Sequence, residues 1–272
     1  MDQLIIIAGL LTALALIEAW RGRFFKKTAT WDDRVVEVFS TLIVPLLVVP
    51  TIFLVTYQFL DWVLPQYKDS LAELSGWVML GLLLIFDDMV QYWYHRLAHS
   101  VPFLFNFHRA HHEARYMSIR VVYRNGFLYY SLLPPLYTSA VMIYLGLGEA
   151  YLYYGLVKVV VIMGAHCAVP WDAFLYRHSW LSPLAWVIER TISTPSTHHA
   201  HHGMNPADGV TNYNGNFGNL LFFWDVLFGT ARITRRYPEA FGVAGEPRPD
   251  YLRQIFFPLF RGWRGNSKKP IT

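Results

Sequence analysis

Histidines with metal-ligand spacing are concentrated in two parts of this 272-residue chain. Five of the 11 histidines lie between His95 and His112, and a further four lie between His198 and His202. Three groups are spaced i, i+4 or i, i+3, i+4, which places their rings on one face of a helix. These groups are His95 and His99; His108, His111 and His112; and His198, His201 and His202. The pattern predicts that imidazoles from distant segments bind metal together.

The number of ligands indicates two metal ions. A catalytic zinc takes three protein ligands and a structural zinc takes four, so eight imidazoles are too many for one ion. Two ions with four or five nitrogens each fit the count and leave positions open for oxygen. Imidazole suits zinc, copper, iron and nickel alike, so the ligands alone predict transition metals without naming one. An HExxH zinc protease is excluded, because no glutamate follows a boxed histidine in that pattern.

Three further residues, His166, His199 and Asp88, are candidates for roles at this site. His166 ends an apolar run and is a candidate ninth ligand, whereas His178 is read as structural. His199 would point about 100° away from His198 on a helix, which predicts a supporting role behind the ligands. Asp88 shares a helix face with His95 but lies about 10 Å along the axis, so we expect it to hold a histidine of another box. The alternative for Asp88 is an ion pair with an interfacial arginine.

The composition indicates an integral membrane protein. The chain is 54% hydrophobic and 17% aromatic, with only 15% charged residues, against roughly 25% in soluble domains. Its single cysteine, Cys167, excludes an internal disulfide and a thiolate metal cluster. No cleavable signal peptide is expected, because no positive charge precedes the first apolar run.

The expected fold is all-α: an integral membrane helical bundle of about four to five runs, with a cytoplasmic helical cap that carries the histidine boxes. The third run contains Asp87 and Asp88, and a tight turn at 145–150 joins the fourth to the fifth. We expect one membrane domain over 1–272, made of N-terminal helices (1–80), a catalytic region (81–230) and a C-terminal segment (231–272). The apolar runs are 4–20, 38–60, 74–94, 127–144 and 151–165.

The positive charges predict the orientation of the bundle. Segments 21–34, 95–124 and 166–272 hold 5, 5 and 11 Lys and Arg residues, whereas loops 61–73 and 146–150 hold 1 and 0. The positive-inside rule then places all histidines on the cytoplasmic side. This placement accounts for the net charge of +4 and leaves no reason to expect nucleic-acid binding. Segment 251–263 combines aromatic and cationic residues, so it is expected to lie in the membrane interface or to pack against the cap.

The three boxes, HRLAH (95–99), HRAHH (108–112) and HHAHH (198–202), resemble those of the fatty acid hydroxylase/sterol desaturase superfamily. Segment 216–230, NFGNLLFFWDVLFGT, and the approach DMVQYWYHR (88–96) are also similar to that family. The resemblance covers about residues 80–230. It implies a membrane di-iron enzyme that uses O2 and two electrons to attack a C–H bond of a lipid.

Carried over to this chain, the resemblance implies a set of iron ligands. His166 matches the histidine that members place between the second and third boxes, although here 31 residues separate it from the third box. The chain has no visible nucleotide motif or haem extension, so a separate reductase, ferredoxin or cytochrome would supply electrons. The implied ligands are His95, His99, His108, His111, His112, His166, His198, His201 and His202.

Three alternatives to a lipid hydroxylase stay open at this stage. A desaturase on the same scaffold would share every ligand. A zinc-dependent membrane hydrolase would work without O2 or reductant, and a non-catalytic metal-binding membrane protein would change no lipid. Zinc binds such nitrogen sites more tightly than Fe(II), so purified protein is expected to be able to carry zinc even if iron is the working metal.

Overall fold

Helices account for the secondary structure of the described part of the chain. The computed structural model describes residues 2–245 and 247–260. Within these ranges there is no strand, and the extended pairing amounts to two isolated bridges, Ile192 with Leu221 and Gly203 with Phe241. The expectation of an all-α chain is therefore confirmed.

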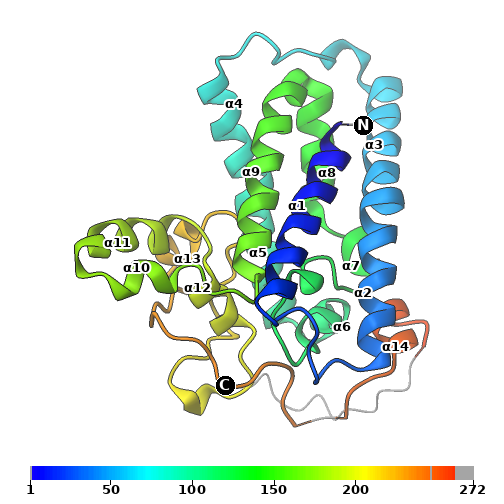
Figure 1. Cartoon of the computed structure of the whole chain (residues 1–272). Helices are drawn as coiled ribbons and strands as arrows, with labels where there is room; N and C mark the ends of the chain where they lie inside the picture. Colours follow the sequence, from blue (N-terminus) through cyan, green and yellow to red (C-terminus); the bar gives the residue numbers. More distant parts are fainter. Residues whose placement is uncertain (1, 246, 261–272) are drawn as a thin grey trace.

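A tall bundle forms one half of the molecule (Figure 1). It contains α1 (Asp2–Trp20), α2 (Trp31–Ile43), α3 (Val49–Val63), α4 (Gly76–Leu83), α8 (Pro134–Met142) and α9 (Gly148–His166). The helix begun by α4 continues through a π-helical turn, Leu84–Met89, into α5 (Val90–Ser100). It starts later than the expected run at 74–94 and extends past it, so that both His95 and His99 lie on its last turns.

Two helical stretches are long and apolar enough to cross a membrane, Trp31–Val63 and Phe127–His166. The first runs through Pro45 and Pro50, and a π-helical turn at Val44–Val48 joins its two parts. Ile5–Trp20 is a shorter apolar helix. The expectation of four to five membrane runs is thus met in part by these two stretches, and the remaining runs stay a prediction.

The second stretch reverses direction at Gly146, so α8 and α9 run in opposite directions (Figure 1). Gly146 has φ 108°, a conformation that glycine adopts without steric cost. A Cβ atom at this position would also lie 2.9 Å from the backbone nitrogen of Ala72. The tight turn expected at 145–150 is therefore present, and glycine is required in it.

A smaller helical part covers one end of the bundle and carries the second and third histidine boxes (Figure 1). Glu18 links the bundle to this part, because its carboxylate accepts hydrogen bonds from Ser118 Oγ (2.6 Å), Ile119 N (3.0 Å) and Ala168 N (2.7 Å). The helices of this part are α6 (Pro102–His112), α7 (Phe127–Ser131), α10 (Ala173–Arg177), α11 (Ser182–Thr191), α12 (Pro195–His201), α13 (Phe223–Leu227) and α14 (Tyr251–Phe256).

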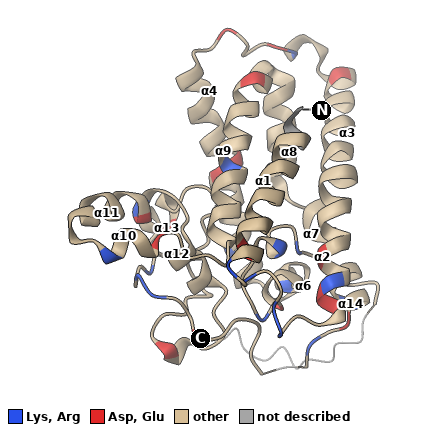
Figure 2. Cartoon of the chain, in the orientation of Figure 1, with Lys and Arg blue, Asp and Glu red and all other residues tan. Residues whose placement is uncertain are grey.

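Charged residues gather at the two ends of the molecule, and the middle of the bundle is mostly uncharged (Figure 2). The exception joins α9 to the helix of α4 and α5. Lys158 Nζ lies 2.7 Å from Asp87 Oδ2, and Tyr154 donates a hydrogen bond of 2.6 Å to the same oxygen. This cluster ties together two helices that both carry histidines in their final turns.

The C-terminal helix α14 packs against the protein. Gln254 and Ile255 are buried, and α14 contacts α2, α6 and α7. Leu259 and Phe260 beyond it are exposed. This packing agrees with the second of the two alternatives for segment 251–263; an interfacial position of its exposed side stays a prediction, and residues 261–263 lie outside the described part.

Candidate metal centre

Four segments bring nine histidines to one buried place. α5 carries His95 and His99, α6 carries the second box, α12 and the residue after it carry the third, and α9 ends at His166. Eight of these nine side chains are buried and His99 is half-buried. All nine residues implied as ligands by the sequence therefore lie together in the structure.

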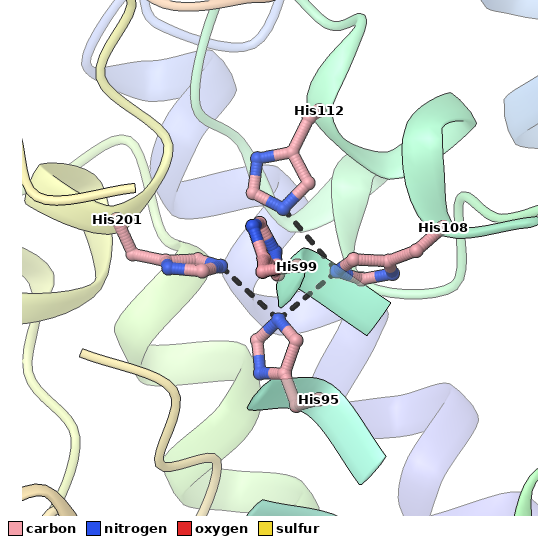
Figure 3. Close-up of side chains that lie close together, drawn as sticks. All are labelled: His95, His99, His108, His112 and His201. Atoms are coloured by element: carbon pink, nitrogen blue, oxygen red, sulfur yellow. Dashed lines mark hydrogen bonds between the residues drawn. The ribbon is translucent and has the colours of Figure 1, made fainter. Parts of the chain in front are cut away.

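The nine rings divide into two groups whose ligand nitrogens lie within 4.8 Å of one another. The first group has five members, shown in Figure 3: His95, His99, His108, His112 and His201. The second has four: His111, His166, His198 and His202. Groups of five and four agree with the expectation of four or five nitrogens per ion. Each HxxHH box is split, because neighbouring residues of one helix turn face different groups.

In the first group, the Nδ1 atoms of three histidines donate hydrogen bonds to carbonyl oxygens. His95 Nδ1 lies 2.7 Å from the Phe217 carbonyl and His201 Nδ1 lies 2.8 Å from the Gly215 carbonyl. His108 Nδ1 lies 2.9 Å from Asn125 Oδ1. Because a carbonyl oxygen can only accept, each of these Nδ1 atoms must carry the proton. The Nε2 atom of each neutral ring therefore presents a lone pair.

Two members of the second group follow the same rule. His111 Nδ1 donates to the Arg124 carbonyl at 3.1 Å, and His166 Nδ1 donates to the Ile162 carbonyl at 2.8 Å. Such bonds fix the tautomer and the ring orientation of metal-ligating histidines. The Nε2 atoms of His111 and His166 lie 3.3 Å apart.

These lone pairs point at one another, which fits a bound cation. His95 Nε2 lies 3.0 Å from His108 Nε2 and 3.1 Å from His201 Nε2 (dashed in Figure 3), although none of the three holds a proton to share. Two facing lone pairs repel each other. Burial and neighbouring imidazoles lower the pKa of His108 and His201 well below the usual range, so these rings do not take up a second proton that would relieve the repulsion. A metal ion among the nitrogens does, and the donor set suits a transition metal.

A loop between α12 and α13 holds the two carbonyls that orient His95 and His201. Asp225 accepts hydrogen bonds from Phe217 N (2.8 Å) and Gly218 N (2.6 Å) and from Thr230 Oγ1 (2.6 Å). The buried carboxylate thus fixes the loop in the position that presents its carbonyls to the rings.

Arg124 and Asn125 hold the second box. Arg124 is fully buried and donates to the Ala110 carbonyl (2.7 Å), while its guanidinium lies 2.9 Å from Asp33 Oδ1. The residue that supplies the carbonyl for His111 is therefore anchored to both α6 and α2. Its neighbour Asn125 supplies the oxygen for His108.

The expectation that Asp88 holds a histidine is wrong. Asp88 is buried, but its Oδ2 accepts hydrogen bonds from Trp224 Nε1 (2.8 Å) and Leu221 N (3.1 Å). It therefore ties α13 to the ligand-bearing helix. Its partners lie more than 130 residues away in the chain, and among the described residues its hydrogen bonds involve no arginine.

His199 and His178 lie outside both groups. The ring of His199 is buried against Tyr237 and Phe241, and it makes a hydrogen bond to the backbone of Cys167, next to His166. It points away from the ligands, as its helix position predicts, and braces the segment that follows α9. His178 is exposed and contacts Phe174 and Trp180.

Asn125, Arg124 and Asp225 were not identified from the sequence. A weak signal exists for Asp225, which lies within the family-like segment 216–230. Asn125 and Arg124 follow the second box by little more than a dozen residues, but no spacing rule links them to it. Their roles depend on the fold of the loops.

Comparison with known proteins agrees with this geometry. The family model described as fatty acid hydroxylase matches residues 80–230. Alkylglycerol monooxygenase of Danio rerio is 27% identical over 154 residues, which are 53% of this chain and 28% of the relative. Ornithine lipid hydroxylase OlsE of Rhizobium tropici is 30% identical over 199 residues, which are 71% of this chain and 54% of the relative.

The chain thus spans about half of one of these curated relatives and less of the other. No solved structure matched the chain. The matched region contains the three histidine boxes, His166 and the loop that orients two of the rings. This chain belongs to the fatty acid hydroxylase family, within the fatty acid hydroxylase/sterol desaturase superfamily.

Proposed function

We propose that the chain is a membrane-bound di-iron oxygenase that hydroxylates a C–H bond in the apolar chain of a lipid. One observation carries the metal part of the proposal: unprotonated Nε2 atoms converge at 3.0–3.3 Å in two groups. The family membership and the two named lipid-oxidising relatives support the reaction class. In the balanced reaction, the lipid, O2, two electrons and two protons give an alcohol and water.

The roles of the chain's own residues follow from their contacts. The nine histidines of the two groups would hold the ions, and iron would supply the activation of O2. Phe217, Gly215 and Asn125 keep the proton on Nδ1 of their histidines, so that the Nε2 lone pairs stay available. Burial of eight of the nine rings excludes bulk water, which protects a reactive centre from side reactions.

The membrane setting is part of the same proposal. The two long apolar stretches would cross the bilayer, and the excess of Lys and Arg beside the histidines would place the centre at the cytoplasmic surface. A lipid could then reach the centre from the bilayer, while a separate reductase, ferredoxin or cytochrome would approach from the cytoplasm. The domain division at about residues 80 and 230 is proposed with it.

The experiment compares the lipids of cells that express the protein with those of cells that express His198→Ala. His178→Ala is the matched control, because it removes an exposed imidazole that belongs to neither group. We expect a lipid that gains one oxygen atom, derived from isotopically labelled O2, with the protein and the control but not with His198→Ala.

The outcomes separate the alternatives. Loss of two hydrogens without a gain of oxygen would identify desaturation. Activity without O2 or reductant would identify a hydrolase. No changed lipid from any pool, with iron loaded and a competent electron donor present, would overturn the proposal of an oxygenase.

A further inference from the structure

The segment between the last residue of α9 and the third histidine box forms a helical projection. α10 and α11 run across the direction of α9, beside the end of the bundle that carries the histidines (Figure 1). We call the segment 171–191 the lateral hairpin. It contains α10 (Ala173–Arg177), a short turn and α11 (Ser182–Thr191), and α12 begins four residues after it.

The lateral hairpin buries carboxylates, whereas a helical segment surrounded by water is expected to turn its charged side chains outward. Asp172 is fully buried and accepts hydrogen bonds from Tyr237 Oη (2.5 Å) and Ser196 N (2.8 Å). Glu189 is 1% exposed and lies 2.8 Å from the Arg235 guanidinium. The inward side is therefore held by polar contacts.

The outward side of the hairpin is apolar. Trp180 is 74% exposed and Trp186 is 55% exposed. On α11 the exposed side chains include Leu184, Trp186 and Val187, while Ala185 and Glu189 face inward. Single exposed apolar residues are normal on soluble proteins, but a contiguous patch marks an interaction surface. The large exposed apolar side chains of the hairpin are Trp171, Phe174, Trp180, Leu184, Trp186 and Val187.

Neighbouring elements extend this patch. α13 contacts α11 and exposes Phe223, Val226 and Leu227. Cations lie beside the apolar residues: Arg177 is exposed, and the Arg190 guanidinium lies 4.6 Å from the centre of a Trp186 ring. Tryptophan together with arginine is typical of the boundary between lipid headgroups and acyl chains.

We infer that the lateral hairpin lies in the headgroup–acyl boundary of the bilayer, with its outward face in the lipid. Lipid is the expected neighbour of this face, because the hairpin follows directly on the end of α9. The exposed Val157 and Val160 of α9 belong to a stretch apolar enough to cross the membrane. Amphipathic helices in this position bury their apolar face about 5–10 Å into the boundary. The orientation across α9 is the one that an in-plane helix requires (Figure 1).

This position connects the lipid surface to the third box. Asp172 bonds Ser196 N at the start of α12, and α12 carries His198 and His201. The membrane contact therefore supports the segment that supplies ligands to both histidine groups. A second copy of the chain is the other occupant that an apolar face admits, and the experiment distinguishes it.

The test uses cysteine probes in lipid nanodiscs. The single native cysteine, Cys167, is buried and can be replaced by alanine. Trp180→Cys and Val187→Cys place a small fluorophore on the outward face. Ala207→Cys is the matched control, because Ala207 is exposed in the 206–208 turn, far from the bundle (yellow, at the bottom of Figure 1).

We expect acyl-chain-brominated phosphatidylcholine to quench the probes at 180 and 187 about twofold or more strongly than the probe at 207, as burial in the boundary requires. Quenching at 180 and 187 no stronger than at 207 would overturn the inference, and disulfide-linked dimers of Val187→Cys would then identify a second copy as the occupant. The two labelled positions are exposed and independent, so misfolding of one variant leaves the other as a test. The readout needs no catalysis and is separate from the proposed function.

Discussion

Replacing Lys158 by methionine tests whether an ion pair in the bundle fixes the positions of the histidines along the helix axes. Lys158 is paired with Asp87 at 2.7 Å, and the two side chains are 13% and 5% exposed. Asp87 lies eight residues before His95, and Lys158 lies eight residues before His166. At 1.5 Å per residue, the ion pair stands about 12 Å above both histidines, so it fixes the relative height of two helices that serve different histidine groups.

The magnitude follows from the burial of the pair. Lys158→Met removes the ion pair from the Asp87 carboxylate and leaves it the hydrogen bond from the Tyr154 hydroxyl. Removing one partner of a buried pair costs about 3–5 kcal/mol, whereas replacing both by apolar residues is often neutral. We therefore expect Lys158→Met to destabilise the protein by that amount and Asp87→Leu/Lys158→Met to recover most of the loss.

The assay is reversible unfolding of the purified protein in mixed micelles, together with metal content per chain. A double-mutant cycle isolates the coupling between the two side chains. Lys158→Met should also bind less metal, and the double variant should regain it. If Lys158→Met were as stable as the unmodified protein, or the double variant were less stable than either single variant, the ion pair would not act as described.

Three further predictions concern the histidine groups. Asn125→Ala should weaken metal binding about 10–100-fold, because the ring of His108 loses the partner that orients it, as competition with a chelator would measure. His166→Ala should lower the metal content from two ions per chain towards one in elemental analysis, whereas His178→Ala should leave it unchanged. Metal removal by a chelator should lower the thermal midpoint; zinc should restore the midpoint alone, and Fe(II) should restore both midpoint and lipid oxidation under O2.

The parts of the site that follow from helix geometry could be predicted from the sequence. The i, i+3, i+4 spacing places three rings on one helix face, and the turn near Gly146 follows from its composition. The division of each HxxHH box between two groups could not be predicted, because it depends on how α6 and α12 are rotated against each other. His111 and His112 are adjacent in the sequence, yet they face different groups.

The partners of buried polar groups were harder to predict. Asp88 shares a helix face with His95, but its hydrogen bonds go to Trp224 of α13 and to Leu221 just before this helix, whose position the sequence does not predict. The lateral hairpin was also missed as a membrane surface. Its carboxylates, Asp172 and Glu189, suggest a water-exposed segment until the fold reveals that they face inward.

The division of the boxes has a consequence for how the centre would assemble. α6 sends His108 and His112 to one group and His111 to the other, and α12 and the residue after it divide their histidines in the same way. An ion bound in one group would therefore order the backbone of the other group before a second ion binds, so the entropic cost of ordering both helices would fall on the first ion alone. Uptake of the two ions would then be cooperative, and chains that hold a single ion would be scarce during titration.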